Sequence, residues 1–461
     1  MTSQKHYDII IIGGGSGNSI PTADYADKSI AIIEKAKFGG TCLNVGCIPT
    51  KMFVYAAETA ENIRNAKKLG IHATVDHVDW QSIVSRVFDN LIDPIAESGA
   101  AYRRGPETPN IDVYDQHATF IGEKLIRTGN GDEEVIISAD QIVLAAGARP
   151  MIPDYVVESG VQYHTNETIM RLPALPKSML VLGGGFIALE FSHVFQALGV
   201  DVHLVNRSAK LLRQLDADIS DRITDLTSKK MHTYLGQTVT SLTQDEHGVH
   251  AVLSNGQTID AEIVLVATGR VPNGDQLNLA AGGVEMRNGR VVVDEFGRTT
   301  ADGVFALGDI SSPYQLKHVA NAEARAISHN LLHPDDLIAF PHKHVPAGIF
   351  THPQIATVGL TEEQARQQGF DITVKVQQYG DVAYGWAMVD TDHFAKLIAD
   401  KATGKLLGAH IIGPQATTLM QTLITFMAYD IDVREAVRTQ YWIHPALPEL
   451  LENALLGLDF S

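Results

Sequence analysis

The sequence predicts an α/β protein with two doubly wound domains of parallel strands, followed by a smaller α+β domain. Three observations favour this class: two glycine-rich turns follow apolar strands, each copy has a later apolar strand that closes it, and the sequence pattern changes after Pro341. With 461 residues, 45% hydrophobic and 20% charged, the chain has the length of about three domains, each with its own core.

The first glycine turn lies in DIIIIGGGSGN, a pattern that predicts a buried strand, a turn and the start of a helix. Gly13 makes the turn and Gly15 leaves room for a pyrophosphate. Glu34 ends the next strand twenty-one residues after Gly13, where a carboxylate can bind ribose hydroxyls. Asn18 replaces the third glycine of the motif and a proline follows, so we expect a short, interrupted helix.

The second copy, SMLVLGGGFIALE, repeats strand, turn and helix start, and its turn contains Gly183 and Gly185. The next strand, VDVHLV, ends at Asn206 and Arg207, and Arg213 follows. An acid there would repel a 2′-phosphate, whereas arginines bind one through charge-assisted hydrogen bonds. The repeat predicts two Rossmann-like dinucleotide-binding domains, the second for NADPH. Two solvated loop arginines remain the alternative.

A third fragment, VFALGDI, places Asp309 directly after an apolar strand, where its carboxylate can accept hydrogen bonds from a polyol chain. Beside the other motifs, it indicates the ribityl end of a flavin site. After Pro341, HVPAGIFTHPQIATVGL predicts strands, TEEQ at 361–364 predicts a capping box, and residues 415–430 predict an apolar helix. Such an α+β tail can bury its apolar face within one chain or against a second copy.

The expected boundaries divide the chain into three domains: 1–150 with 273–338 for FAD, 151–272 for NADPH, and 339–461 for dimerisation. The 36 basic and 54 acidic residues give a net charge of −18, which disfavours nucleic acid or an anionic membrane as partner. The first residues lack an export signal and no apolar run is long enough for a membrane span. We therefore expect a cytoplasmic protein.

The two cysteines of the chain both lie in GGTCLNVGCIPTK, at Cys42 and Cys47. A structural disulfide there would close too short a loop to stabilise the fold much. A zinc site would need two further ligands at metal spacing, and none is evident, so no metal is expected. A reversible redox pair remains. A helix that begins near Cys47 favours its thiolate, and Lys51 lies one turn further on.

These segments closely resemble the flavin-dependent disulfide reductases, which include glutathione reductase and lipoamide dehydrogenase. The resemblance covers essentially the whole chain and is carried by GGTCLNVGCIPTK, GGGFIALE, ATGRVPN, VFALGDI and HPALPE. It implies a homodimeric enzyme with FAD and NADPH as cofactors. It also implies that Cys47 is the thiol next to the flavin, that Cys42 attacks the substrate disulfide, and that Lys51 pairs with Glu190.

His444 stands out among 19 histidines because Glu449 follows five residues later, across a proline-rich bend. A carboxylate at that place can orient the imidazole and keep its pKa useful near neutrality. In the resembled family, this pair reaches the cysteines of the other subunit. His444 is therefore expected to be the acid–base for thiol exchange, with Glu449 as its orienting partner.

The resemblance also implies a set of cofactor contacts around the glycine turns, the cysteine segment and the closing strands. Phe186 stands where glutathione reductases have the tyrosine that covers the flavin. The full set of expected cofactor-binding residues is Gly13, Gly15, Ser16, Glu34, Lys35, Gly40, Thr41, Lys51, Ala146, Gly147, Asp309, Gly183, Gly185, Phe186, Ile187, Glu190, Asn206, Arg207, Arg213, Gly269 and Arg270.

The substrate disulfide is expected to be weakly charged. Glutathione reductases carry arginines in the first helix, whereas SIPTADYADKS offers Asp24 and Asp27 and no arginine. Together with KMFVYAAE and YWIHPALPE, this segment looks most like family members that reduce the disulfide of mycothiol, a cysteinyl-glucosaminyl-inositol thiol. A lipoamide dehydrogenase that uses NAD, a glutathione-type reductase, and a non-catalytic NADPH/flavin redox sensor are the alternatives.

Overall fold

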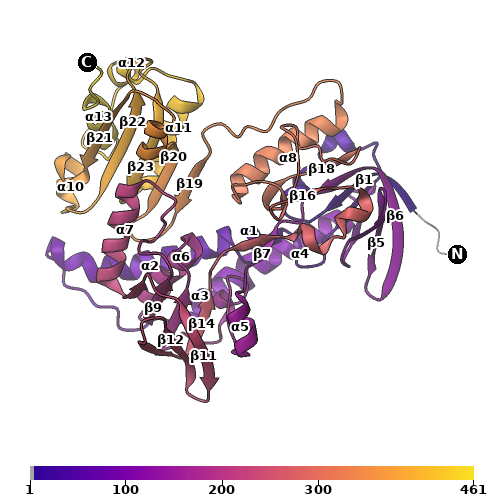
Figure 1. Cartoon of the computed structure of the whole chain (residues 1–461), viewed down its shortest axis with the longest axis horizontal. Helices are drawn as coiled ribbons and strands as arrows, with labels where there is room; N and C mark the ends of the chain where they lie inside the picture. Colours follow the sequence, from indigo (N-terminus) through magenta and orange to yellow (C-terminus); the bar gives the residue numbers. More distant parts are fainter. Residues whose placement is uncertain (1–4) are drawn as a thin grey trace.

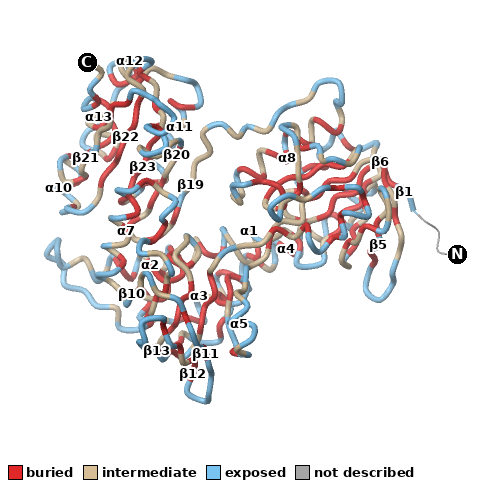
Figure 2. The backbone as a smooth tube through the Cα atoms, in the orientation of Figure 1, coloured by how far each residue is buried: buried red, intermediate tan, exposed pale blue. Residues whose placement is uncertain are grey.

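The structure is a computed structural model that describes residues 5–461, and its secondary structure gathers in three units (Figure 1). The first contains a seven-stranded sheet, the second a four-stranded sheet with a three-stranded one, and the third a five-stranded sheet. Buried residues follow the strands of each unit (Figure 2). The predicted α/β class with a C-terminal α+β unit is confirmed.

The seven-stranded sheet is parallel at its centre and antiparallel at one edge, in the order β3-β2-β1-β6-β5-β4 with β18 also paired to β6. Its apolar β-branched residues lie between two layers, and Ile10 and Ile11 are fully buried. The strands are β1 (Lys5–Ile12), β2 (Ile30–Ile33), β3 (Ile111–Tyr114), β4 (Thr119–Gly122), β5 (Leu125–Asn130), β6 (Glu133–Leu144) and β18 (Val304–Ala306).

The segment after the first glycine turn is short and interrupted at the proline, as the sequence predicts, but it forms 3-10 turns in place of an α-helix. It forms two 3-10 turns, Ser16–Ser19 and Ala23–Tyr25, with Pro21 between them. The buried Arg103 donates from Nε to Oδ1 of Asn18 at 2.7 Å and from Nη2 to the Pro21 carbonyl at 3.3 Å. The proline has no amide hydrogen to continue a helix, and Arg103 binds the carbonyl that a further turn would use.

Gly17 supplies the close packing that the third motif glycine otherwise gives. A Cβ at Gly17 would lie 2.8 Å from Cβ of Ala145 and 2.8 Å from Cγ2 of Ile11. The segment therefore sits directly on the ends of the central strands without a full α-helix.

The second unit follows the predicted strand–turn–helix order. Four parallel strands in the order β10-β9-β8-β14 are accompanied by an antiparallel sheet in the order β11-β12-β13. Helix α6 (Phe186–Ala197) begins at the second glycine turn and α7 (Ala217–Lys230) returns the chain to β10. The strands are β8 (Ser178–Leu182), β9 (Asp201–Asn206), β10 (His232–Leu235), β11 (Val239–Asp245), β12 (Gly248–Leu253), β13 (Thr258–Ala261) and β14 (Ile263–Val266).

The chain passes from the first unit to the second and back through two paired segments. Strand β7 (Ala148–Pro150) leaves the first unit, and β15 (Arg270–Pro272) returns antiparallel to it. The two crossings are thus hydrogen-bonded to each other at the boundary between the units. A further two-stranded ribbon, β16 (Met286–Arg287) with β17 (Arg290–Val291), precedes β18.

The third unit is an antiparallel sheet in the order β19-β20-β23-β22-β21, with helices packed on it. The predicted capping box is confirmed, because the Thr361 side chain accepts from the Gln364 amide and Gln364 returns the bond to the Thr361 amide. The apolar helix predicted for residues 415–430 is confirmed as α11 (Ala416–Ala428). The strands are β19 (Pro346–Ile349), β20 (Ile355–Gly359), β21 (Ile372–Gln378), β22 (Phe394–Asp400) and β23 (Leu406–Ile412).

A buried lysine joins the second and third units. Lys396 on β22 is 3% exposed, and its ammonium contacts Asp216 at 2.9 Å, Asp218 at 2.7 Å and Glu362 at 2.8 Å. Asp216 caps the start of α7, and Glu362 opens α9 (Glu362–Gln367). Three carboxylates compensate one buried cation, so this junction depends on Lys396 being present.

The remaining helices complete the layers around these sheets, and α2 packs against α6. Within residues 5–461, no helix combines the length and apolar character that crossing a membrane requires. The helices are α1 (Gly40–Asn44), α2 (Cys47–Asn65), α3 (Trp80–Val87), the π-helical segment Phe88–Ile92, α4 (Asp93–Arg104), α5 (Asp154–Ser159), α8 (Lys317–Leu332), α10 (Ala383–Ala387), α12 (Val433–Thr439) and α13 (Pro448–Leu456).

Candidate active site

The cysteine segment folds as two helices that meet at a glycine. Cys42 lies in α1, and Cys47 is the first residue of α2, with Gly46 in the capping position. A Cβ at Gly46 would lie 2.8 Å from the Thr41 carbonyl, so only glycine allows the two helices to approach this closely. Asn44 is buried and donates to the backbone carbonyl of Gly40 at 3.0 Å, which fixes α1.

The two thiols are free and have opposite acidities. The Cys42 S–H donates to the sulfur of Cys47, and this bond with the nearby Lys51 charge lowers the pKa of Cys47 to about 7. The same bond, with burial, raises the pKa of Cys42. Near pH 7 Cys47 is therefore partly ionised, whereas Cys42 keeps its proton. This is the dithiol state from which an intrachain disulfide can form.

Lys51 is held beside the thiols by the second glycine unit. Its ammonium lies 2.7 Å from Oε2 of Glu190 on α6, and the Glu190 carboxylate is almost fully buried. The other oxygen, Oε1, accepts from the Phe350 amide at 2.8 Å. The ammonium also lies 4.5 Å from the centre of the Phe350 ring. Glu190 on α6 and Phe350 after β19 thus fix the positive charge of Lys51 near Cys47.

Both glycine turns rest against the strand that closes their unit. A Cβ at Gly13, where φ is +117°, would lie 2.2 Å from the Ala145 carbonyl oxygen. A Cβ at Gly183, where φ is +129°, would lie 2.3 Å from the Ala267 carbonyl oxygen. The repeated contact shows that the two copies share one geometry at their glycine turns.

A cavity of about 1460 Å³ runs from the first glycine turn to the thiols. That volume exceeds the roughly 300–1,000 Å³ of pockets for drug-sized ligands, and it suits a dinucleotide. Its lining brings together seventeen of the residues that the sequence indicates: Gly13, Gly15, Ser16, Glu34, Lys35, Gly40, Thr41, Cys42, Cys47, Lys51, Ala146, Gly147, Phe186, Ile187, Glu190, Arg270 and Asp309.

Two carboxylates in this cavity, those of Glu34 and Asp309, can accept hydrogen bonds from hydroxyl groups of a ligand. Glu34 accepts from the amides of Gly14 at 2.8 Å and Ala36 at 2.9 Å. Asp309 lies 3.7 Å from Nε of Arg270, and burial raises the pKa of its carboxyl group. An enclosed carboxyl group with one distant ion-pair partner still has oxygen lone pairs free to accept hydrogen bonds. A polyol chain can supply the hydroxyl donors.

Lys317, the first residue of α8, is a cavity residue that sequence reasoning missed. Its ammonium donates to Oγ of Ser16 at 2.8 Å, and its charge acts on Cys42 and Asp309. It lies eight residues after Asp309, outside VFALGDI and the other motifs of the sequence. The fold therefore adds a cation next to the first glycine turn, where an anion such as a pyrophosphate could bind.

The expected 2′-phosphate residues lie at the end of β9 and in the loop after it, outside the cavity lining. Arg207 and Arg213 are exposed, and neither forms an ion pair within residues 5–461. Asn206 orders the loop between them by donating to the carbonyls of Ser208 at 3.0 Å and Lys210 at 3.1 Å. Two uncommitted guanidinium groups at a strand end can receive a phosphate.

The other expected nucleotide residues flank the same end of the sheet. Gly185 caps α6, and a Cβ there would meet no atom within 4 Å, so its backbone is open to a ligand. Phe186 is 40% exposed at the cavity wall. Gly269 precedes β15 with φ +145°.

His444 and Glu449 form a pair away from the thiols of their own chain. Nδ1 of His444 lies 3.2 Å from Oε2 of Glu449, and the histidine side chain is 64% exposed. Neither residue lines the cavity, and Figure 1 places α13 on the opposite side of the third unit from α1. With Nδ1 facing the carboxylate, Nε2 is left to exchange a proton with another group.

Two family models match this chain: pyridine nucleotide-disulphide oxidoreductase over residues 7–326, and the dimerisation domain of the same family over residues 345–455. The chain belongs to the pyridine nucleotide-disulphide oxidoreductase family. Its relatives include a mycothione reductase of Mycobacterium tuberculosis, 55% identical over 98% of this chain and 99% of the relative. A dihydrolipoyl dehydrogenase of Zymomonas mobilis is 30% identical over 98% of both chains.

Among solved structures, the Cu(II) complex of the HOCl-induced flavoprotein disulfide reductase RclA from Escherichia coli is similar to this oxidoreductase, with a TM-score of 0.87. The two are 26% identical, and the match covers 98% of this chain and 99% of the other. The family and its mycothione reductase relative support the expected cofactors, FAD and NADPH. The enclosed Asp309 and the glycine cradle of the cavity fit the larger of them.

Proposed function

We propose that this protein reduces the disulfide of mycothiol to two thiols with NADPH, acting as a homodimer whose subunits share each active site. The relative with 55% identity, a mycothione reductase, is the observation that carries the substrate. The dimerisation domain over residues 345–455 supports the assembly. We further propose that residues 151–272 form the NADPH domain, 1–150 with 273–338 the FAD domain, and 339–461 the dimerisation domain.

Bound FAD would supply two-electron transfer between NADPH and the Cys42–Cys47 pair. Residues of the first glycine turn, with Glu34, Lys317 and Asp309, would hold FAD. Arg207 and Arg213 would hold the 2′-phosphate of NADPH. The remaining chemistry belongs to the two sulfurs and the groups that move their protons.

Thiol exchange begins when Cys42 loses its proton, and its raised pKa means that a base must assist. The Cys42 thiolate attacks one sulfur of the substrate, forms a mixed disulfide, and expels one substrate thiolate. The thiolate of Cys47 then attacks the sulfur of Cys42, expels the second thiol, and leaves the Cys42–Cys47 disulfide. Two electrons leave the cysteines and two substrate sulfurs are reduced.

His444 of a second subunit is the proposed base and acid. Glu449 fixes its Nδ1, and Nε2 takes the proton of Cys42 and returns it to the departing thiolate. In a complementation test, mixing inactive His444→Gln and Cys42→Ser subunits should restore one working site per heterodimer. Absence of recovery in heterodimers verified by mass would place the base within the same chain as the thiols.

The substrate is tested by comparing mycothiol disulfide with glutathione disulfide. Asp24 and Asp27 are exposed, and Lys28, the one basic residue of that segment, already pairs with Asp27 at 3.0 Å. A tripeptide disulfide with several carboxylates finds no cation there, whereas a sugar–inositol thiol needs hydroxyl partners. We expect kcat/KM for mycothiol disulfide to be at least about a hundredfold higher, or about 2.7 kcal/mol.

Measuring kcat/KM at two ionic strengths separates charge repulsion from shape. If repulsion contributes, added salt should partly raise kcat/KM for glutathione disulfide. Equal values for the two substrates would reject mycothiol disulfide while leaving a general disulfide reductase. The 30% identical dihydrolipoyl dehydrogenase makes lipoamide the second candidate. Arg207 and Arg213 after β9, unpaired within the part of the chain that the structure describes, disfavour a lipoamide dehydrogenase, because that enzyme would use NAD. A measured preference for NADH over NADPH would favour it again.

A further inference from the structure

A cluster of two histidines and an aspartate lies on the second unit, outside the active site. Asp201 and His203 are two residues apart on β9, so their side chains leave the same face of the sheet. His232 on β10 is the registered partner of His203 in the parallel pair. The fold thus gathers three metal-binding groups that are separated by up to 31 positions in the sequence.

The distances within the cluster match those between ligands of one small cation. Asp201 Oδ2 lies 3.2 Å from Nε2 of His203, and Oδ1 lies 3.4 Å from Nε2 of His232. Ligand atoms about 2.0–2.1 Å from a tetrahedral zinc ion are about 3.3 Å apart. One ligand atom from each of the three residues lies within 4.8 Å of the others. The imidazole rings are stacked with centres 4.7 Å apart, so small rotations bring both nitrogens to one ion.

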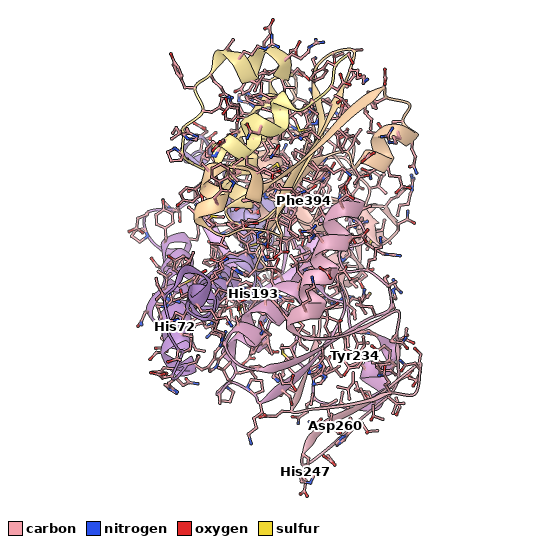
Figure 3. The ribbon with its side chains drawn as sticks, turned by 90° about the vertical axis from the view of Figure 1, so that its left-hand side faces the viewer. His72, His193, Tyr234, His247, Asp260 and Phe394 are labelled. Carbon is pink, nitrogen blue, oxygen red and sulfur yellow. The ribbon has the colours of Figure 1, made fainter. Side chains whose placement is uncertain are left out.

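A second-layer residue supports one of the imidazoles. The Tyr234 hydroxyl lies 3.2 Å from Nδ1 of His203. Tyr234 is two residues after His232 on β10, so both side chains leave the same face. A partner at the non-ligating nitrogen is the usual way in which metal-binding histidines are oriented. Figure 3 shows Tyr234 on this unit, well away from His247 at the end of the β11–β12 hairpin.

The cluster also has room for further ligands. Asp201 and His232 line a surface cavity of about 550 Å³. Their side chains are 56% and 61% exposed, whereas His203 is 15% exposed. Two partly open ligands and one enclosed ligand leave space for water or another donor to complete the shell.

We propose that Asp201, His203 and His232 bind one divalent transition ion of the zinc class at the outer edge of the NADPH-binding sheet. Two imidazoles and one carboxylate suit Zn²⁺, Co²⁺, Ni²⁺ or Cu²⁺ rather than Mg²⁺, which prefers oxygen ligands. The ion links β10, an edge strand, to β9. It therefore stabilises the sheet whose opposite end carries Asn206 and Arg207.

The test uses flavin-loaded protein with Cys42→Ser and Cys47→Ser, because thiolates bind the same ions. Equilibrium dialysis against Zn²⁺, with metal and protein quantified, should give one ion per chain with a dissociation constant below about 100 μM, and Mg²⁺ should not compete. Zn²⁺ should also raise the melting temperature, since a ligand that binds the folded state stabilises it.

Variants assign the ion to the cluster. His232→Ala should weaken Zn²⁺ binding by about a hundredfold, and Tyr234→Phe by about tenfold, since outer-layer partners contribute roughly 10–100-fold. His247→Ala, which removes an exposed histidine of the same unit, should bind as the parent does. If circular dichroism shows that His232→Ala is misfolded, the Zn²⁺ affinity of Asp201→Asn, which keeps the side-chain size, is measured in its place. Unchanged Zn²⁺ affinity in His232→Ala or Asp201→Asn, or no stoichiometric binding in the parent, overturns the proposal.

Discussion

The acidity of Cys47 depends on a hydrogen bond that can be removed without touching the thiol itself. Cys42→Ala deletes the donor, whereas Cys42→Ser keeps an O–H in its place. Hydrogen bonds to charged groups contribute about 1.5–3 kcal/mol, and the exposure of Cys47 to the cleft favours the lower end. Since 1.36 kcal/mol equals one pKa unit, the pKa of Cys47 should rise from about 7 to about 8 in Cys42→Ala.

The assay is the pH dependence of iodoacetamide alkylation, followed by mass. The chain has two cysteines, so each single variant leaves one thiol and the label reports Cys47 alone. At pH 6, Cys42→Ala should react about tenfold more slowly than Cys42→Ser, because the thiolate fraction falls in proportion. Coincident pH profiles for the two variants would refute the argument and assign the low pKa to Lys51 and the start of α2 instead.

Two further predictions concern the nucleotide and the junction between units. Replacing Arg207 and Arg213 by Ala should raise KM for NADPH by about ten- to a hundredfold and leave KM for NADH unchanged, whereas equal losses would mean that they bind the shared pyrophosphate. Lys396→Met should destabilise the protein by about 3–5 kcal/mol in urea unfolding, against less than about 0.5 kcal/mol for the exposed Lys229→Met. Because Lys396 lowers the pKa of Glu362 below its ordinary 4.5, the Lys396 effect should be full above that pH and diminish on acidification.

Local sequence patterns predicted the structure correctly where the signals for strand, turn and helix lie in one continuous segment. The second glycine turn, the capping box at Thr361 and helix α11 formed as the sequence predicted. In the segment after the first turn, the sequence predicted the interruption at the proline but not the 3-10 form, because Arg103 binds Asn18 from 85 positions away. No local pattern contains that contact.

The same limit explains the site residues that the sequence did not indicate. Lys317 lies 301 positions after Ser16 and meets it because β18, just before α8, pairs with the first sheet. His203 and His232 face each other because of the register of two parallel strands, which a sequence pattern does not specify. Motif reading finds groups that bind through one continuous segment, whereas groups assembled by strand pairing require the fold.

The pairing of β18 with β6 has a consequence for how the protein is made on the ribosome. Strand β6 ends at Leu144 and its partner begins at Val304, so the partner emerges about 160 residues later. At about 5–20 residues per second, the flank of β6 waits roughly 8–30 s for that strand. During the same interval all strands of the second unit, between Ser178 and Val266, have been synthesised. The inserted unit therefore has time to fold first, and a nascent chain that stalls in this window presents an unpaired strand edge to its neighbours and to chaperones.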